Sequence, residues 1–268
     1  MRQRREQVFL QRGDGAYGAA RRLLERMGFG LRGKRVFVKP NLVNAKSAAE
    51  GVTTDLGVCR AIFERLEDCR VTLGDAGGDT KASLRRNGYT KLCREFGVET
   101  VDLNDDEIVW LEVPRPVVYE RVPFSRRVLE AEVRIDVAKL KLHSSAQVTL
   151  TLKNWFGCVP TYRERSKIHP RISRAIVDLV QVAPPHLCLI DGIIGNNFNE
   201  VTPSPIHVGI MIGGRDALAV DIVGTQCMGI NPDDIVQLTE ARRILGERTI
   251  AIDGPAIEEV MVPFLAGV

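Results

Sequence analysis

The amino-acid sequence predicts an α/β protein, with a mainly parallel sheet flanked by helices and a β-rich insertion around residues 105–135. Three observations support this class. Short apolar segments alternate with segments of helical spacing along most of the chain. The composition, with 44% hydrophobic and 26% charged residues, is ordinary for a globular protein. No internal repeat or long linker divides the 268 residues, so we expect a single α/β domain over residues 1–268.

The first part of the chain predicts alternating helices and strands. Apolar residues recur every three or four positions in the helices, whereas the strands are short apolar runs. Proline cannot continue a central ladder, so the first of these strands should end at Pro40. The expected elements are a helix at about Ala16–Met27, a strand at Arg35–Val38, a helix at Thr54–Leu66, a strand at Arg70–Leu73, a helix at Leu84–Phe96 and a strand at Val98–Leu103.

The middle of the chain changes character before the α/β pattern resumes. Residues 108–136 alternate apolar and polar side chains, and prolines at positions 114, 116 and 123 interrupt them. This pattern is typical of antiparallel strands or hairpins, and it predicts the β-rich insertion. The remaining expected elements are a strand at Val137–Leu142, helices at about Ala146–Phe156 and Pro170–Val182, strands at Leu187–Ile190 and His207–Gly213, helices at Ala217–Met228 and Asp234–Leu245, and a strand at Thr249–Ile252.

The formal net charge is only +3, but the charges are unevenly distributed. Residues 138–176 carry eight basic side chains and one acidic side chain, whereas residues 177–268 carry four and twelve. A basic block favours binding of an anionic ligand; the alternative is a solvated face that pairs with the acidic last third. Residues 1–35 carry ten basic and three acidic side chains. The plainest interpretation of this N-terminal charge is an exposed, arginine-rich first helix.

Polar or glycine-containing clusters follow four of the expected strands. They are Lys39-Pro40-Asn41, Gly74–Gly78 with its Asp75, the group Lys139, Lys141 and His143, and Asp191-Gly192. In open α/β sheets, ligands bind beyond the carboxyl ends of the strands. If these strands are parallel neighbours, the four clusters share one crevice, which is then the predicted site.

One expected strand carries three basic side chains at alternate positions. Residues two apart in a strand point to the same face, so Lys139, Lys141 and His143 should form one row. Such crowding lowers the pKa values of neighbouring cations and favours an anionic partner or proton transfer. The alternative is a solvent-exposed edge strand, where lysines discourage pairing with other chains.

The following segment adds further polar candidates. Lys153 and Asn154 stand just before two aromatic residues and a glycine, and Lys167 and His169 flank an isoleucine. His143 and His169 each lie two positions from a lysine, which favours acid–base work or contact with an anion.

Several of these segments together resemble a known family. They are Val38–Val43, Gly51–Asp55, Gly74–Gly78, Lys139–His143, Leu152–Cys158, Lys167 with His169, Asp191-Gly192 and Gly213–Asp221. In order and combination they resemble the family called domain of unknown function 362. Many members of that family carry an appended ferredoxin-like segment with cysteine-bound clusters, which implies redox chemistry. This chain ends at Val268 without a Cys-x-x-Cys motif, so we expect the version without the iron–sulfur segment.

Other classes of partner are less favoured. No apolar run approaches the roughly 20 residues that span a bilayer, and the charged N-terminus is unlike an export signal. We therefore expect no membrane contact, a cytoplasmic location and reduced, mostly buried cysteines. No nucleic-acid-binding module is recognisable, so no nucleic acid is expected. His143, His169, Asp75 and Asp191 could ligate a metal, but nothing fixes their separation and no metal is assigned. The sequence assigns neither a cofactor nor an oligomeric state.

These observations favour an enzyme that binds a small anionic substrate, a carboxylate or a phosphate. Its chemistry would be acid–base, or redox with electrons supplied by a partner protein or an external cofactor. One alternative is a non-catalytic accessory protein that holds an anion or cofactor for a redox or biosynthetic partner. Another is a structural protein whose basic block docks on an acidic partner. The expected catalytic residues are His143, Lys141 and His169. The expected substrate-binding residues are Lys39, Asn41, Asp75, Lys139, Lys153, Asn154, Lys167 and Asp191.

Overall fold

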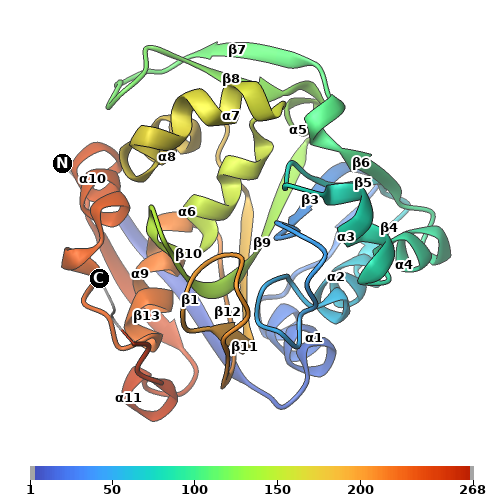
Figure 1. Cartoon of the computed structure of the whole chain (residues 1–268). Coiled ribbons are helices and arrows are strands. Elements are labelled where there is room, and N and C mark those ends of the chain that lie inside the picture. Colours follow the sequence, from blue (N-terminus) through green and yellow to red (C-terminus); the bar gives the residue numbers. More distant parts are fainter. Residues whose placement is uncertain (1–3, 266–268) are drawn as a thin grey trace.

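The computed structural model describes residues 4–265 and confirms the α/β class. Within this range one mixed sheet has the strand order β13-β1-β12-β11-β9-β3-β5-β6, and β10 pairs with β9 outside that path. The core of the fold is therefore one large sheet (Figure 1). Its strands are β1 (Arg4–Arg12), β3 (Arg35–Pro40), β5 (Arg70–Asp75), β6 (Glu99–Asp102), β9 (Val133–His143), β10 (Gln147–Thr149), β11 (Leu187–Asn196), β12 (Pro205–Gly214) and β13 (Arg248–Asp253).

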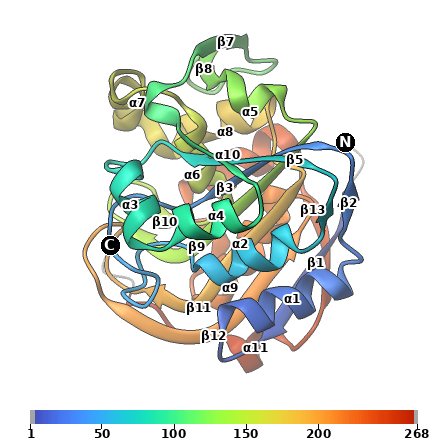
Figure 2. The same cartoon turned by 90° about the vertical axis from the view of Figure 1, so that its right-hand side faces the viewer.

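Helices cover both faces of the sheet and enclose two hydrophobic clusters. The first group packs on one face and lies in front in Figure 2: α1 (Ala16–Arg26), α2 (Leu56–Phe63), α3 (Thr80–Arg86) and α4 (Tyr89–Glu95). The second group contributes to the cluster on the other face: α5 (Arg126–Glu130), α6 (Thr151–Asn154), α7 (Tyr162–Ile168), α8 (Ile172–Val182), α9 (Ala217–Cys227), α10 (Val236–Leu245) and α11 (Ile257–Val260). All six cysteines are unpaired, and only Cys69 is partly exposed.

The central strands run in parallel. β11, β9, β3, β5 and β6 are consecutive neighbours, and each adjacent pair is parallel. Their carboxyl ends therefore meet at one edge of the sheet, as the four polar clusters require. β12 runs antiparallel to both β11 and β1, which makes the other half of the sheet mixed.

β9 is a central strand, so the alternative of an exposed edge strand is wrong. It pairs with β11 on one side and β3 on the other. Leu140 and Leu142 pack into the core on one face. Lys139 and Lys141 are buried as well, with exposed fractions of 1% and 0%. The basic row is therefore internal.

The predicted insertion is present as a hairpin apart from the main sheet. β7 (Ile108–Glu112) and β8 (Arg121–Ser125) pair antiparallel at the top of Figure 1. Asp178 on α8 accepts hydrogen bonds from three backbone N–H groups of the connecting loop, at Val117, Val118 and Tyr119. Two short strands, β2 (Leu31–Arg32) and β4 (Leu66–Glu67), form a further small sheet.

The interpretation of the N-terminal charge as a first helix is wrong in part. Residues 4–12 form β1, which lies inside the sheet between β13 and β12. Val8 and Leu10 are fully buried at alternate positions, a period that suits a strand. Several of the arginines, including Arg21 and Arg22, do lie exposed on the helix α1 that follows.

Two segments predicted as single helices, Ala146–Phe156 and Leu84–Phe96, are not single helices in the structure. Around residue 148 the chain first forms β10, because Ala146, Val148 and Leu150 are all buried and alternate with period two. The helical part is limited to α6 and a 3₁₀ turn. The helix predicted over Leu84–Phe96 is divided at Gly88, whose φ of 79° is left-handed and interrupts the helix between α3 and α4. Helix α7 was not predicted, and the segment after it starts as a 3₁₀ turn at His169–Arg171.

Candidate functional site

A cavity of about 250 Å³ lies at the carboxyl ends of β3, β5 and β9. Seven of the predicted site residues line it: Lys39, Asn41, Asp75, His143, Lys153, Asn154 and His169. Four do not line it: Lys139, Lys141, Lys167 and Asp191. The topology therefore brings together seven residues that are spread between positions 39 and 169 of the sequence.

A buried ion pair forms the floor of this cavity. The Lys39 amine lies 2.8 Å from Asp75 Oδ1, and the two side chains are 1% and 5% exposed. Lys39 also donates to Asn154 Oδ1 and to the carbonyl of Pro40, both at 2.9 Å. The second oxygen of Asp75 accepts the backbone N–H of Leu42 at 2.8 Å. These contacts fix both charged groups at the ends of adjacent strands.

Asn154 connects β3, the residue that follows it and β9 through its side-chain amide. Its oxygen accepts hydrogen bonds from Lys39 and from Asn41 Nδ2, and its nitrogen donates to Asp136 Oδ1 at 2.7 Å. The other oxygen of Asp136 is buried and has no partner among the described residues. Burial raises the pKa of Asp136 well above its ordinary value, although Lys39 opposes the shift. This environment favours the neutral carboxyl group.

Lys139 and Asp191 form a second buried ion pair away from the cavity. The amine is 2.8 Å from Asp191 Oδ2, which also accepts the backbone N–H of Asp55. Asp191 Oδ1 accepts the N–H of Ile193. The pair thus ties β9, β11 and the start of α2 together, and its observed contacts are structural.

Lys141 also lies behind the cavity. Its amine donates to Asn41 Oδ1 at 2.9 Å, to the carbonyl of Val52 at 2.7 Å and to the carbonyl of Glu200 at 3.0 Å. Three acceptors use all three hydrogens of an ammonium group. Its pKa is lowered well below the ordinary value, and the main cause is burial, with the neighbouring lysines as smaller contributions. Crowding was therefore a secondary cause. Its predicted catalytic role stays a prediction, and its contacts are those of a positioning residue.

Lys153 has different surroundings. It lies on α6, lines the cavity and is half-buried. Its amine has no hydrogen bond or ion pair with any described residue, and it lies 5.2 Å from the centre of the Phe156 ring. Burial, and next the charge of Lys39, lower the pKa of Lys153 to about 8. The amine is therefore available to a ligand.

Two charged residues of the cavity were missed in the sequence. Arg165 on α7 is 8% exposed and donates to the carbonyl of Val159 and to Asn104 Oδ1. Burial lowers its pKa, and no carboxylate within residues 4–265 pairs with it. Glu200, from the loop after β11, accepts hydrogen bonds from the N–H and hydroxyl of Ser144. The only sequence signal for Arg165 was its place inside the basic block.

His143 is held as a neutral imidazole. Its Nδ1 accepts hydrogen bonds from the backbone N–H groups of Ser145 and Ala146, at 3.0 and 3.2 Å. In the neutral ring the hydrogen then sits on Nε2. Burial and the charges of Lys153 and Lys141 lower the pKa of His143 from 6.5 to about 2. The predicted proton-carrier role stays a prediction, and these contacts favour a neutral hydrogen-bond donor.

The lowered pKa of His143 predicts acid sensitivity. Between pH 6.5 and about 2 the unfolded chain binds a proton that the folded chain does not, so stability falls as the pH falls. At pH 5 this group should have lost about 2 kcal/mol of its stabilising effect, because one pKa unit is worth about 1.4 kcal/mol. Urea unfolding at pH 7 and 5 measures this loss. His143→Gln should lose about 2 kcal/mol less than the natural protein, and equal losses would contradict the assignment.

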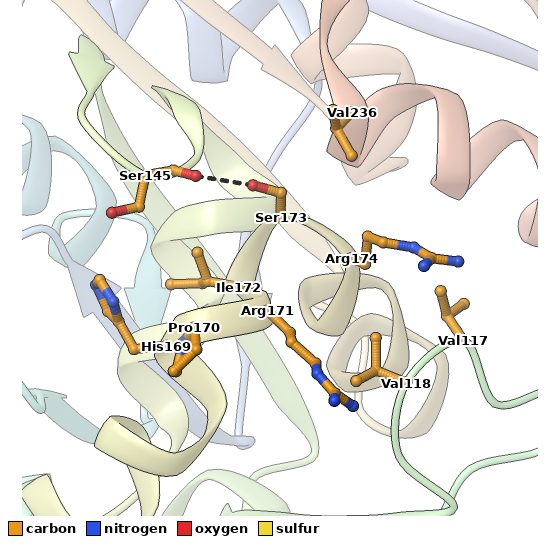
Figure 3. Close-up of a pocket in the computed structure, with 10 residues that line it drawn as sticks. All are labelled: Val117, Val118, Ser145, His169, Pro170, Arg171, Ile172, Ser173, Arg174 and Val236. Atoms are coloured by element: carbon orange, nitrogen blue, oxygen red, sulfur yellow. Dashed lines mark hydrogen bonds between the residues drawn. The ribbon is translucent and has the colours of Figure 1, made fainter.

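His169 and Lys167 lie toward the surface. The Lys167 amine pairs with Glu164 at 2.7 Å, and its side chain is 55% exposed. His169 is exposed and also lines a second, larger cavity of about 560 Å³. Figure 3 shows His169 at one side of this cavity, away from Arg174, and the Ser173 hydroxyl bonded to the carbonyl of Ser145. The two cavities are therefore neighbours that share His169.

No group of three His, Cys, Asp or Glu side chains within residues 4–265 is arranged to hold a metal ion. Three of the four residues that the sequence offers as metal ligands have other partners. Asp75 and Asp191 bond to lysines, and the Nδ1 of His143 accepts two backbone N–H groups. In the same range no helix has both the length and the apolar character needed to cross a bilayer.

Two known proteins are similar to this chain, one in sequence and one in structure. A thylakoid-associated protein from Synechocystis sp. is 25% identical over 271 residues, which cover 91% of this chain and 83% of that protein. The lactate racemase apoprotein from Thermoanaerobacterium thermosaccharolyticum is 10% identical, with a TM-score of 0.47 over 85% of this chain. This chain spans 58% of the length of the racemase.

The family is shown by a match to a family model. The model of the domain of unknown function 362 (DUF362) family matches residues 36–226, from the first parallel strand to helix α9. That range contains every residue named above as lining the 250 Å³ cavity. The protein therefore belongs to the DUF362 family, as its sequence motifs predicted.

Proposed function

We propose that this protein is an enzyme that binds a small anion, a carboxylate or a phosphate, in the 250 Å³ cavity. One observation carries the proposal. Lys153 and Arg165 both line the cavity, and neither has a carboxylate partner among the described residues. Buried cations without a counter-charge are costly, and an anionic ligand would supply that charge.

The other charges of the cavity are the Lys39–Asp75 pair and one carboxylate, that of Glu200, whose charge opposes the lowering of the Lys153 pKa. The carboxylate of Glu200 is held by Ser144, and its oxygen lies 3.8 Å from His143 Nδ1, which is neutral. A ligand would therefore add its negative charge next to the two unpaired cations rather than displace an existing ion pair.

The amide side chains of the cavity have orienting roles in this proposal. Both polar atoms of Asn154 and both of Asn41 bond to neighbouring side chains. They hold Lys39 and Lys141 in place and have little capacity left for a ligand. His143 Nε2–H is the neutral donor that would complement Lys153 and Arg165.

Two features favour chemistry over simple binding. Lys153 is a half-buried amine whose pKa is lowered to about 8. Asp136 is a buried carboxyl group whose pKa is raised, and it lies behind the cavity, hydrogen-bonded to the lining residue Asn154. Groups with strongly perturbed pKa values that gather at a cleft are typical of active sites. A non-catalytic accessory protein would bind the anion without turnover.

Isothermal titration with inorganic phosphate tests the anion site. Lys153→Ala and Arg165→Lys should each weaken phosphate binding at least tenfold, about 1.4 kcal/mol. The first removes a charged donor, and the second replaces the planar fork of the guanidinium with a single ammonium group. Lys167→Ala is the matched control, since Lys167 lies nearby on α7 but is exposed and paired with Glu164. It should leave binding within twofold.

The outcomes of this titration separate the functional classes. Equal effects of all three variants would contradict the proposed site and favour a diffuse basic face. Thermal unfolding of each variant checks that the fold survives. Mass spectrometry of metabolites that co-purify with the protein, followed by turnover assays on them, distinguishes an enzyme from an accessory protein.

A further inference from the structure

We infer that Lys153 is a covalent catalyst, whose amine forms an imine with the carbonyl carbon of a small oxo acid bound in the cavity. This inference rests on the proposed anion site and names its substrate class. It requires a lysine that is free, positioned and close to groups that can hold a carboxylate.

Lys153 differs from the other lysines at the strand ends. Lys39 and Lys139 are each paired with a buried carboxylate, and Lys141 has three oxygen acceptors. The amine of Lys153 has no such partner within the described residues, and the face of Phe156 lies 5.2 Å away. A nitrogen that is held by no hydrogen bond or ion pair can attack an electrophile after leaving only its contact with the Phe156 ring.

The environment also makes the amine a competent nucleophile. Burial and the nearby charge of Lys39 lower the pKa of Lys153 to about 8. At pH 7 about one amine in ten is then neutral, compared with fewer than about one in a thousand for an ordinary lysine. Desolvation and a neighbouring cation are the usual means of activating a lysine for covalent catalysis.

The backbone that carries Lys153 is rigidly held. Asp221 is fully buried and accepts the N–H groups of Thr151 and Leu152, at 2.7 and 2.9 Å. On the other side of Lys153, the amide of Asn154 bonds to Lys39, Asn41 and Asp136. The amine therefore extends into the cavity from a fixed segment, as positioned catalysis requires.

The cavity supplies partners for both ends of an oxo acid. Arg165 would bind the carboxylate, and its planar guanidinium suits that shape. His143 Nε2–H would donate to the carbonyl oxygen and polarise the carbonyl group. The neutral amine of Lys153 attacks the carbonyl carbon, and the C–O bond of the resulting carbinolamine breaks. The oxygen leaves as water with both hydrogens of the amine, so the imine forms without an oxidant or reductant.

Reductive trapping tests this step on the full chain. The protein is incubated separately with glyoxylate, pyruvate, 2-oxoglutarate and acetoacetate, each with sodium borohydride, and analysed by intact mass and peptide mapping. At least one oxo acid should leave a reduced adduct on the peptide that contains Lys153. Lys153→Arg should reduce the trapped fraction at least tenfold, whereas Lys167→Arg should leave it unchanged. Saturating phosphate should protect Lys153 from trapping.

Phosphate titration of the same sample tests the anion site separately from the covalent role of Lys153. If phosphate binds and depends on Lys153, but no oxo acid is trapped there, the covalent role is overturned and the anion site stands. If neither phosphate binding nor trapping depends on Lys153, both proposals fail. An adduct spread evenly over surface lysines, and unchanged in Lys153→Arg, also overturns the covalent role.

Discussion

Removing the carboxylate of Asp191 is expected to destabilise the protein by about 3–5 kcal/mol, because it leaves a buried charge without its partner. Lys139 and Asp191 are 1% and 0% exposed, and their charged atoms are 2.8 Å apart. Asp191→Ala would also leave the backbone N–H groups of Asp55 and Ile193 without their acceptor. The effect on stability should therefore be larger than that of any exposed ion pair in the molecule.

Urea unfolding of a double variant and of an exposed control, beside Asp191→Ala, tests whether the unpaired buried charge causes the loss of stability. The double variant Lys139→Met with Asp191→Leu replaces both charges with apolar groups. It should recover the part of the lost stability that is due to the unpaired charge, while the N–H groups of Asp55 and Ile193 still lack their acceptor. Asp105→Ala is the exposed control, since Lys81 and Asp105 form an ion pair with side chains 62% and 67% exposed. That change should cost less than about 1 kcal/mol. A double variant as unstable as Asp191→Ala would contradict the electrostatic explanation.

Much of the site could be predicted from the sequence because it depends on strand topology. Lys39, Asp75 and Asp191 each follow or end a predicted strand, and parallel strands bring their carboxyl ends together. What the sequence could not predict was which residues face the cavity. Alternation correctly puts Lys139 and Lys141 on one face of β9. The segments that bury Lys141 come from distant loops, and they include its hydrogen-bond acceptors Val52 and Glu200.

The residues that the sequence did not indicate owe their positions to packing between distant segments. Arg165 reaches the cavity from α7, where bonds to Val159 and Asn104 aim its guanidinium. No local pattern distinguishes it from the exposed Arg163 on the same helix. β1 was missed for a related reason, because its arginines obscure the short alternation of Val8 and Leu10, and only pairing with β12 and β13 defines it as a strand.

Substitution of Gly157 should weaken anion binding at least tenfold while most of the fold remains. Gly157 lies against the buried ion pair, and a Cβ added there would lie 2.6 Å from Lys39 Cε and 2.8 Å from its amine, and would clash with Asp75 Oδ1. Real Cβ atoms essentially never come so close. Neither partner can easily move away, because Asp75 also accepts the N–H of Leu42 and Lys39 also donates to Asn154.

The expected result of Gly157→Ala is a loss of phosphate affinity of at least tenfold, with destabilisation of about 1–3 kcal/mol from overpacking. Gly18→Ala is the control, because Gly18 is inside helix α1 and an added Cβ would meet only Arg22 at 3.5 Å. That change should stabilise the helix by up to about 1 kcal/mol and leave binding unchanged. Phosphate titration and urea unfolding of both variants make the comparison. If Gly157→Ala binds phosphate normally, the Lys39–Asp75 pair does not support the anion site. If it loses binding while its unfolding free energy falls by no more than this amount, the geometry of that pair is what holds the cavity open for a ligand between Lys153 and Arg165.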